Sequence, residues 1–184
     1  MRYSLNLAIV ALTLCAAVSF AAEIPTPTPG VVRLLPSGSE VAGWEVYPDT
    51  LVYAAGESLT EIYDGGYELY TKNGVVDAAQ QVYRRGKNIA TLTTHRMTSM
   101  SAAKKFYKYW QKSDKKQKTY KQLRILTEAY VYSADGSSNG YLYRGKFFVT
   151  VSVNLDGDAG RKSAEAFLRG VSAKYWTLTR RMEK

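Results

Sequence analysis

A dense group of cations is the strongest candidate for chemistry in this sequence. Residues 104–124 contain nine lysines and arginines but only one acid, Asp114. The cations expected to contact a ligand are Lys104, Lys105, Lys108, Lys112, Lys115 and Lys116. Their combined field attracts polymers that carry phosphate or carboxylate groups. The segment therefore predicts a basic surface for an anionic ligand. The alternative is a solvated helix face that pairs with an acidic segment of the same molecule.

Three carboxylates recur at helical spacing earlier in the chain. Glu61, Asp64 and Glu68 would share one face of a helix predicted over residues 59–72. Paired carboxylates bind cations or perform acid–base chemistry, so a hydrolase that uses Asp64 and Glu68 is one alternative function. A single helical stripe supplies no converging ligands, which makes a solvated acidic face the simpler interpretation.

Two other patterns resemble known sites without completing them. Asn154, Asp156 and Asp158 have the spacing of the first calcium ligands in a calcium loop, but Ala159 replaces the required glycine. This segment is interpreted as a strand-to-helix turn. His95 is the only histidine, and no serine lies in a nucleophile elbow, so no serine triad is predicted. Neither a metal ion nor a cofactor is expected.

The sequence holds fifteen tyrosines, and some of them alternate along predicted strands. The four that alternate on two neighbouring strands are Tyr130, Tyr132, Tyr141 and Tyr143. Such a row can stack on sugar rings, but cross-strand aromatic pairs also stabilise a sheet. Stabilisation of the sheet is the preferred interpretation.

The N-terminal segment has the features of an export signal. Arg2 precedes an apolar run over residues 5–18, and residues 19–22 supply a cleavage site, so a signal peptide is predicted over residues 1–22. The run is shorter than a membrane-spanning helix, and no transmembrane segment is expected after cleavage. Cys15, the only cysteine, lies inside the signal. The protein is expected to be periplasmic or extracellular.

Export changes the expected partners of the cations. Without Arg2, 24 of the 25 basic residues remain against 16 acids, which gives a net charge of +8. An exported protein of this charge is expected to meet anionic lipid, lipopolysaccharide or acidic cell-wall polymer rather than nucleic acid. Acids predominate over residues 23–77, so the chain is also dipolar along its sequence.

Hydrophobic periodicity predicts a single α+β domain over residues 31–184, after a proline-rich leader over residues 23–30. Helices are expected over residues 59–72, 101–112 and 162–176. Strands are expected over residues 75–83, 89–96, 128–132, 140–144 and 147–154. Residues 83–87 and residues 143–146 share one pattern, in which Tyr-Arg is followed by Gly-Lys. Each copy precedes a β-branched strand and then a helix that ends in Lys-Tyr-Trp. This predicts a duplicated β-hairpin-plus-helix unit in a mainly antiparallel sheet with helices packed on a face.

Several segments together resemble an uncharacterised family of exported bacterial proteins, the domain of unknown function 6599. The segments are Leu34-Leu35-Pro36, Gly43-Trp44, residues 59–70, Gly74-Val75 and residues 144–149. The most specific is Asp64-Gly65-Gly66-x-Glu68-x-Tyr70. The resemblance implies a bacterial, exported α+β protein and carries no activity or catalytic residue.

The sequence thus favours an exported envelope protein that acts as a non-catalytic binding or structural module. A hydrolase and a subunit of a larger envelope complex are the alternatives. A complex subunit would expose an apolar patch, whereas the preferred interpretation requires an exposed basic one. The sequence leaves the oligomeric state open.

Overall fold

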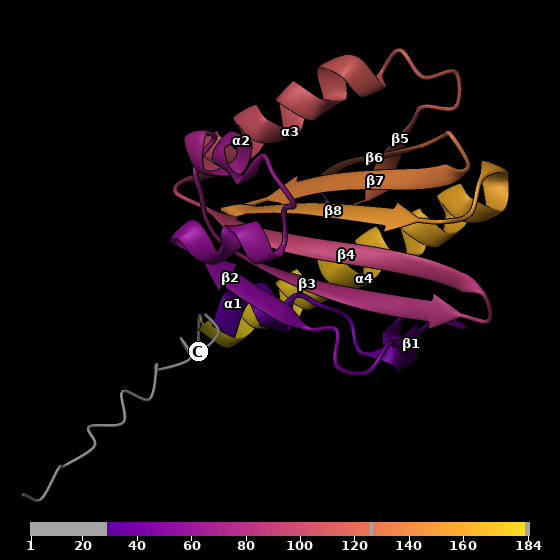
Figure 1. The fold of residues 1–184 in the computed structure, drawn as a ribbon, viewed down its shortest axis with the longest axis horizontal. Coiled ribbons are helices and arrows are strands. Elements are labelled where there is room, and N and C mark those ends of the chain that lie inside the picture. The colour runs from indigo at the N-terminus through magenta and orange to yellow at the C-terminus, as the bar shows by residue number, and fades with distance from the viewer. Residues whose placement is uncertain (1–28, 126, 183–184) are drawn as a thin grey trace, which may run out of the picture.

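A computed structural model describes residues 29–125 and 127–182, which form one antiparallel sheet with helices packed on it (Figure 1). The strands are β1 (Glu45–Val46), β2 (Val52–Ala55), β3 (Val75–Arg85), β4 (Asn88–Met97), β5 (Lys121–Ile125), β6 (Thr127–Ala134), β7 (Ser137–Arg144) and β8 (Phe147–Val153). Their order is β1-β3-β4-β8-β7-β6-β5, and β2 also pairs with β3. The predicted α+β fold class is confirmed.

Six helical segments accompany the sheet. The α-helices are α1 (Pro29–Arg33), α2 (Tyr67–Lys72), α3 (Met100–Asp114) and α4 (Gly157–Met182). The 3₁₀ helices are η1 (Gly38–Glu40) and η2 (Gly56–Glu61). The leader predicted over residues 23–30 and the signal predicted over residues 1–22 fall almost wholly outside the described residues.

Helix α4 covers one face of the sheet and passes behind the strands in Figure 1. Its apolar stripe recurs at the helical period, and Ala164, Phe167, Leu168 and Val171 are all buried. These side chains pack against the aliphatic residues of the strands, including Val149. Burial of this continuous apolar surface is the main force that holds α4 on the sheet.

Helix α3 covers part of the opposite face. Phe106 and Tyr107 are fully buried there, and Phe106 packs on Phe148 of β8 with ring centroids 4.9 Å apart. The lysines of α3 are exposed on its outer side, because the spacing of 100° per residue places them opposite the buried Phe106 and Tyr107. A hairpin followed by a helix does occur twice along the chain, but α3 and α4 lie on opposite faces of the sheet. The duplication itself stays a prediction.

The prediction of one continuous helix over residues 59–72 is wrong. The chain forms η2, then a turn over residues 62–66, and only then α2. Gly65 and Gly66 have φ values of 65° and 106°, which lie in the left-handed region that a right-handed helix cannot use. The glycine pair therefore ends one helical segment and starts another.

Strand β5 was not predicted, because residues 115–125 are so rich in charge. Leu123 is its only buried side chain, and β5 pairs on one side only, with β6. A charged edge strand is a common protection against pairing with another chain. The short elements β1, β2 and α1 were also missed. The turn predicted at Asn154 and Asp156 does connect β8 to α4, and Asp156 Oδ1 accepts a hydrogen bond from the Gly157 N–H (2.6 Å).

Candidate functional site

The basic surface comprises Lys104, Lys105, Lys112, Lys115 and Lys116, which lie on the outer side of α3 and in the turn after it. All five are exposed, and none forms an ion pair with another residue of the described ranges. Tyr109 lies between Lys105 and Lys112 on this side of the helix and is 53% exposed. The surface therefore offers five exposed cations that form no ion pair within the described ranges, together with an aromatic ring, although the charge of Lys104 also helps to lower the pKa of Glu128.

Lys108, the sixth predicted cation, has an internal partner. Its Nζ lies 2.6 Å from Glu128 Oε2 on β6 and 3.0 Å from Gln111 Oε1. The ammonium group and a hydrogen bond from Tyr143 lower the pKa of Glu128 below its ordinary value. Lys108 thus fastens α3 to the sheet and is less available to a ligand than the five lysines of the basic surface.

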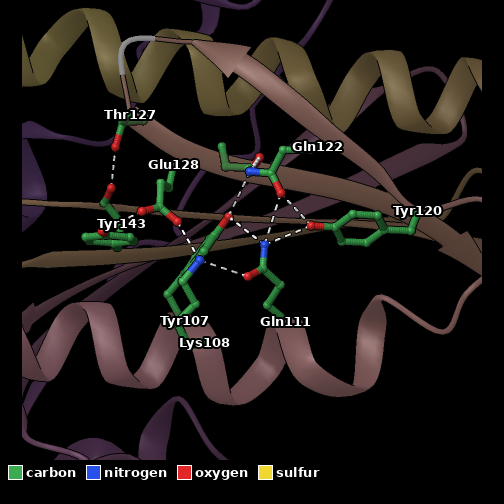
Figure 2. A network of polar contacts seen from close by, with 9 residues as sticks. Tyr107, Lys108, Gln111, Tyr120, Gln122, Thr127, Glu128 and Tyr143 are labelled. Atoms are coloured by element: carbon green, nitrogen blue, oxygen red, sulfur yellow. Dashed lines mark hydrogen bonds and ion pairs between the residues drawn. The ribbon is translucent and has the colours of Figure 1, made fainter.

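Figure 2 shows the polar network that surrounds this ion pair, between α3 and strands β5 to β7. The buried Gln111 amide donates hydrogen bonds to Tyr120 Oη (2.8 Å) and to Gln122 Oε1 (3.0 Å). Gln122 in turn donates to the Ala129 carbonyl (2.8 Å). Because these polar groups satisfy one another, the network fixes the position of α3 and is not an open binding site.

The predicted acidic stripe does not form. Glu61 ends η2, Asp64 lies in the turn and Glu68 lies in α2, so the three carboxylates do not share one helical face. All three are exposed. No ion pair joins them to the basic surface within the described ranges, although such pairing was the alternative interpretation of the lysines. The two charged segments therefore do not neutralise each other through direct contacts.

The other residues of the predicted family segment shape the chain around Tyr70. The left-handed Gly65 and Gly66 turn the backbone into α2, and Tyr70 then stacks on Tyr63 with ring centroids 3.7 Å apart. Tyr70 also lies edge-on to Phe106 of α3. The segment thus places a pair of stacked tyrosines beside the sheet.

His95 contacts both of these stacked tyrosines. It is completely buried on β4, and its Nδ1 lies 2.9 Å from the Phe148 carbonyl oxygen. A carbonyl can only accept, so Nδ1 carries the proton and Nε2 accepts a hydrogen bond from the Tyr63 hydroxyl. Burial lowers the pKa of His95 to about 4, so the imidazole is neutral at physiological pH. Its role is to position Tyr63.

Beside these tyrosines the sheet carries a groove with a volume of about 240 Å³. Its walls are aromatic and comprise Tyr63, Tyr70, Trp110 of α3 and Tyr141 of β7. Its floor consists of short polar side chains from four strands, namely Gln80, Thr91, Thr93, Asn139, Thr150 and Ser152. We call this feature the sheet groove.

Strand register explains why the floor is polar. Thr93 of β4 pairs with Gln80 of β3 on one side and with Thr150 of β8 on the other, so these side chains form a row across one face. Thr91 and Ser152 form part of the next row. Because α3 covers only part of this face, polar side chains occupy the part that remains open.

The sequence analysis missed the floor of the sheet groove and partly identified its walls. Among the four alternating tyrosines, Tyr141 does line the groove, whereas Tyr130 is fully buried and donates to Asp114 Oδ2 (2.7 Å). Polar residues at every second position of β4 and β8 were the available signal, but they also match an ordinary solvent-facing strand. The lining contains no carboxylate, lysine, cysteine or histidine. The groove is thus equipped for binding through stacking and neutral hydrogen bonds.

No protein-family model and no curated protein matches this chain. Among solved structures it is similar to the extracellular domain of PknH from Mycobacterium tuberculosis, with a TM-score of 0.52 and 11% sequence identity. The match covers 81% of this chain and 98% of that domain. At this identity the likeness shows a shared fold. Within residues 29–125 and 127–182, no helix is both long enough and apolar enough to cross a membrane.

Proposed function

We propose that this protein is an exported, non-catalytic binding module whose basic surface captures an anionic component of the bacterial envelope. The observation that carries the proposal is the exposure of five lysines that lack an ion pair within the described ranges. The signal peptide predicted over residues 1–22 supports export, and so does the likeness to an extracellular domain. The resemblance to the uncharacterised exported family supports the same location.

Electrostatics gives the proposed mechanism. Clustered cations raise the local concentration of anionic headgroups or polymer, and each lysine near an anionic membrane contributes about 1 kcal/mol. The exposed ring of Tyr109 adds an amphipathic contact at the interface. The shared ligand chemistry is a dense array of phosphate or carboxylate groups, as lipid, lipopolysaccharide and acidic cell-wall polymer all provide.

Binding to vesicles tests the proposal. The purified mature protein is expected to bind anionic phosphatidylglycerol vesicles at low salt and not to bind neutral phosphatidylcholine vesicles. The bound protein is expected to dissociate as the salt concentration rises. Replacement of Lys104, Lys105 and Lys112 by Glu is expected to abolish binding. Lys108 is left intact, because a glutamate at this position would repel Glu128 and destabilise the fold. Parallel titrations with lipopolysaccharide and with an acidic cell-wall polymer identify the source of the anion.

A matched variant separates a local surface from overall charge. Lys87, Lys146 and Lys162 are exposed and lie in two hairpin turns and on α4. Their replacement by Glu changes the net charge by the same amount, yet is expected to retain most of the binding. Equal loss in both triple variants would show that net charge alone drives adsorption. Absence of binding to all anionic probes at low salt would refute the proposal.

Three exposed apolar side chains support the complex-subunit alternative. Val46, Tyr47 and Leu51 are 38%, 43% and 49% exposed and follow one another around β1 at the sheet edge. The complex-subunit alternative requires exposed apolar side chains of this kind. The hydrolase alternative gains no comparable support, because Asp64 and Glu68 are exposed and neither lines the sheet groove.

A further inference from the structure

We propose that the sheet groove is a binding site for one pyranose ring of a neutral saccharide. This site lies apart from the basic surface, and its ligand differs in charge from the anionic partner proposed above. The inference rests on the aromatic walls, on the unpaired hydroxyl groups of the floor and on the absence of charge in the lining.

The walls suit the flat faces of a sugar. A pyranose ring presents axial C–H groups on its faces, and these pack on aromatic rings. Tyr63 and Tyr70 are stacked at 3.7 Å, with their planes 15° apart, so they act as one rigid wall. Trp110 and Tyr141 are also stacked, at 6.0 Å and 27°. The hydrogen bond from Tyr63 to His95 further restrains the Tyr63–Tyr70 pair, so these side chains lose less conformational entropy when a ligand binds.

The floor suits sugar hydroxyl groups. The hydroxyls of Thr91, Thr150 and Ser152 form no hydrogen bond with any residue of the described ranges, and each can both donate and accept. Gln80 Nε2 donates to Thr93 Oγ1 (3.1 Å), which leaves the Gln80 carbonyl oxygen as an acceptor. These groups lie at neighbouring positions in one row or in adjacent rows of the sheet, so they converge on the same space.

Trp110 lines the groove and also carries a polar group without a partner. Its indole N–H is buried and finds no acceptor among the described residues. A buried donor without a partner costs about 1–3 kcal/mol. Because this N–H is shielded from solvent, a ligand oxygen would reach it only after the Trp110 side chain had turned.

Size and charge narrow the class of ligand. A volume of about 240 Å³ is below the range of about 300–1,000 Å³ that holds drug-sized ligands, so it fits about one ring. A charged ligand would find no counter-charge in the lining, and a purely apolar ligand would leave the floor hydroxyls desolvated and unpaired. A neutral polar ring with apolar faces satisfies both the walls and the floor.

Isothermal titration calorimetry of the mature protein with neutral trisaccharides tests this site. The probes are the trimers of glucose and of N-acetylglucosamine. At least one is expected to bind at millimolar or lower concentration, with an affinity that does not change with salt, because neither partner contributes an ion pair. Thr150→Val keeps the side-chain shape but removes one hydroxyl, and is expected to weaken binding roughly fivefold to tenfold.

A bulky substitution and its control locate the site. Ser152 is exposed on the floor, so Ser152→Trp is expected to fill the groove and abolish saccharide binding while the protein stays folded. Ser101→Trp places the same ring at an exposed position on α3 outside the lining and is expected to leave affinity unchanged.

Three outcomes would overturn the inference. The first is that neither trimer binds at millimolar concentration, and the second is that a folded Ser152→Trp variant binds as the wild type does. The third is that a neutral tripeptide binds in the groove while both saccharides fail. Failure here leaves the vesicle experiment unaffected, because that test uses the lysines of α3 and an anionic probe.

Discussion

His95 links the stability of the protein to pH. In the folded state its pKa is lowered to about 4, against 6.5 for a free histidine, because the side chain is buried. The unfolded chain therefore binds a proton more readily than the native state between these two values. Stability from His95 is complete above about pH 6.5 and is lost as pH falls towards 4, by about 3 kcal/mol in total.

Urea denaturation at several pH values between about 7 and 4 measures this effect. Carboxylates titrate in the same range, so the informative quantity is the difference between the wild type and His95→Gln. The wild type is expected to lose more unfolding free energy on acidification than the variant, even if the variant is less stable at neutral pH. Parallel curves for the two proteins would show that His95 does not govern the acid response.

Individual residues illustrate how far the identity of a side chain predicts its role. Lys105 and Lys108 look alike in the sequence, yet Lys105 is exposed and unpaired within the described ranges, whereas Lys108 forms an ion pair with Glu128. Asp77 belongs to the acidic segment but is fully buried, and Arg96 binds its carboxylate at 2.7 Å. Partners of this kind come from other strands, so residue type and spacing do not reveal them.

The start of α4 depends on a glycine that allows close packing. A Cβ atom at Gly160 would lie 1.8 Å from the Leu155 carbonyl oxygen and 2.2 Å from Ser138 Oγ. Gly160→Ala is therefore expected to push the first turn of α4 away from the sheet and to cost about 3 kcal/mol or more of unfolding free energy. Urea denaturation of the variant measures the loss.

Gly170 in the same helix provides the matched control. A Cβ atom there would have Pro36 as its nearest neighbour, at 3.4 Å, which is an ordinary contact. Gly170→Ala is expected to stabilise the protein by about 0.5–1 kcal/mol, because alanine favours the helix. Similar effects of the two substitutions would mean that helix propensity, and not the close approach at Gly160, determines the result.

Elements differed in how well the sequence predicted them. Strands β3, β4 and β8 and helix α3 follow a clear period of 2 or 3.6, and their predicted ranges overlap the observed ones closely. Helix α4 extends beyond both ends of the range predicted over residues 162–176. The helix predicted over residues 59–72 failed, although its spacing was also helical, because Gly65 and Gly66 adopt left-handed backbone angles. Strand β5 was missed because an edge strand buries so little that its sequence shows no apolar period.

At the scale of the whole molecule, the sheet separates a mainly aliphatic core from one that is richer in aromatic residues. The core under α4 contains Val149 and Phe167, and the core under α3 contains Phe106, Tyr130 and Phe148. Helix α3 leaves part of the second face open, which creates the sheet groove. The basic surface lies on the outer side of α3, whereas Trp110 of the same helix lines the groove.

This arrangement predicts two independent binding activities. The variant in which Lys104, Lys105 and Lys112 are replaced by Glu is expected to keep its saccharide affinity, and Ser152→Trp is expected to keep its vesicle binding. Calorimetry and vesicle sedimentation of both variants provide the measurements. Loss of both activities in either folded variant would indicate a single shared site instead.

The sequence by itself determined the α+β class, the strands β3, β4, β6, β7 and β8, the helices α3 and α4, and the outward orientation of the lysines on α3. These features depend on the periodicity of the sequence, which is a local property. A strand places every second residue on one face and a helix every third or fourth, whatever surrounds them. Only the tertiary structure placed α3 and α4 on opposite faces, paired Lys108 with Glu128 and assembled a groove from four strands. Those features depend on strand order and register, which bring together residues that lie far apart in the chain.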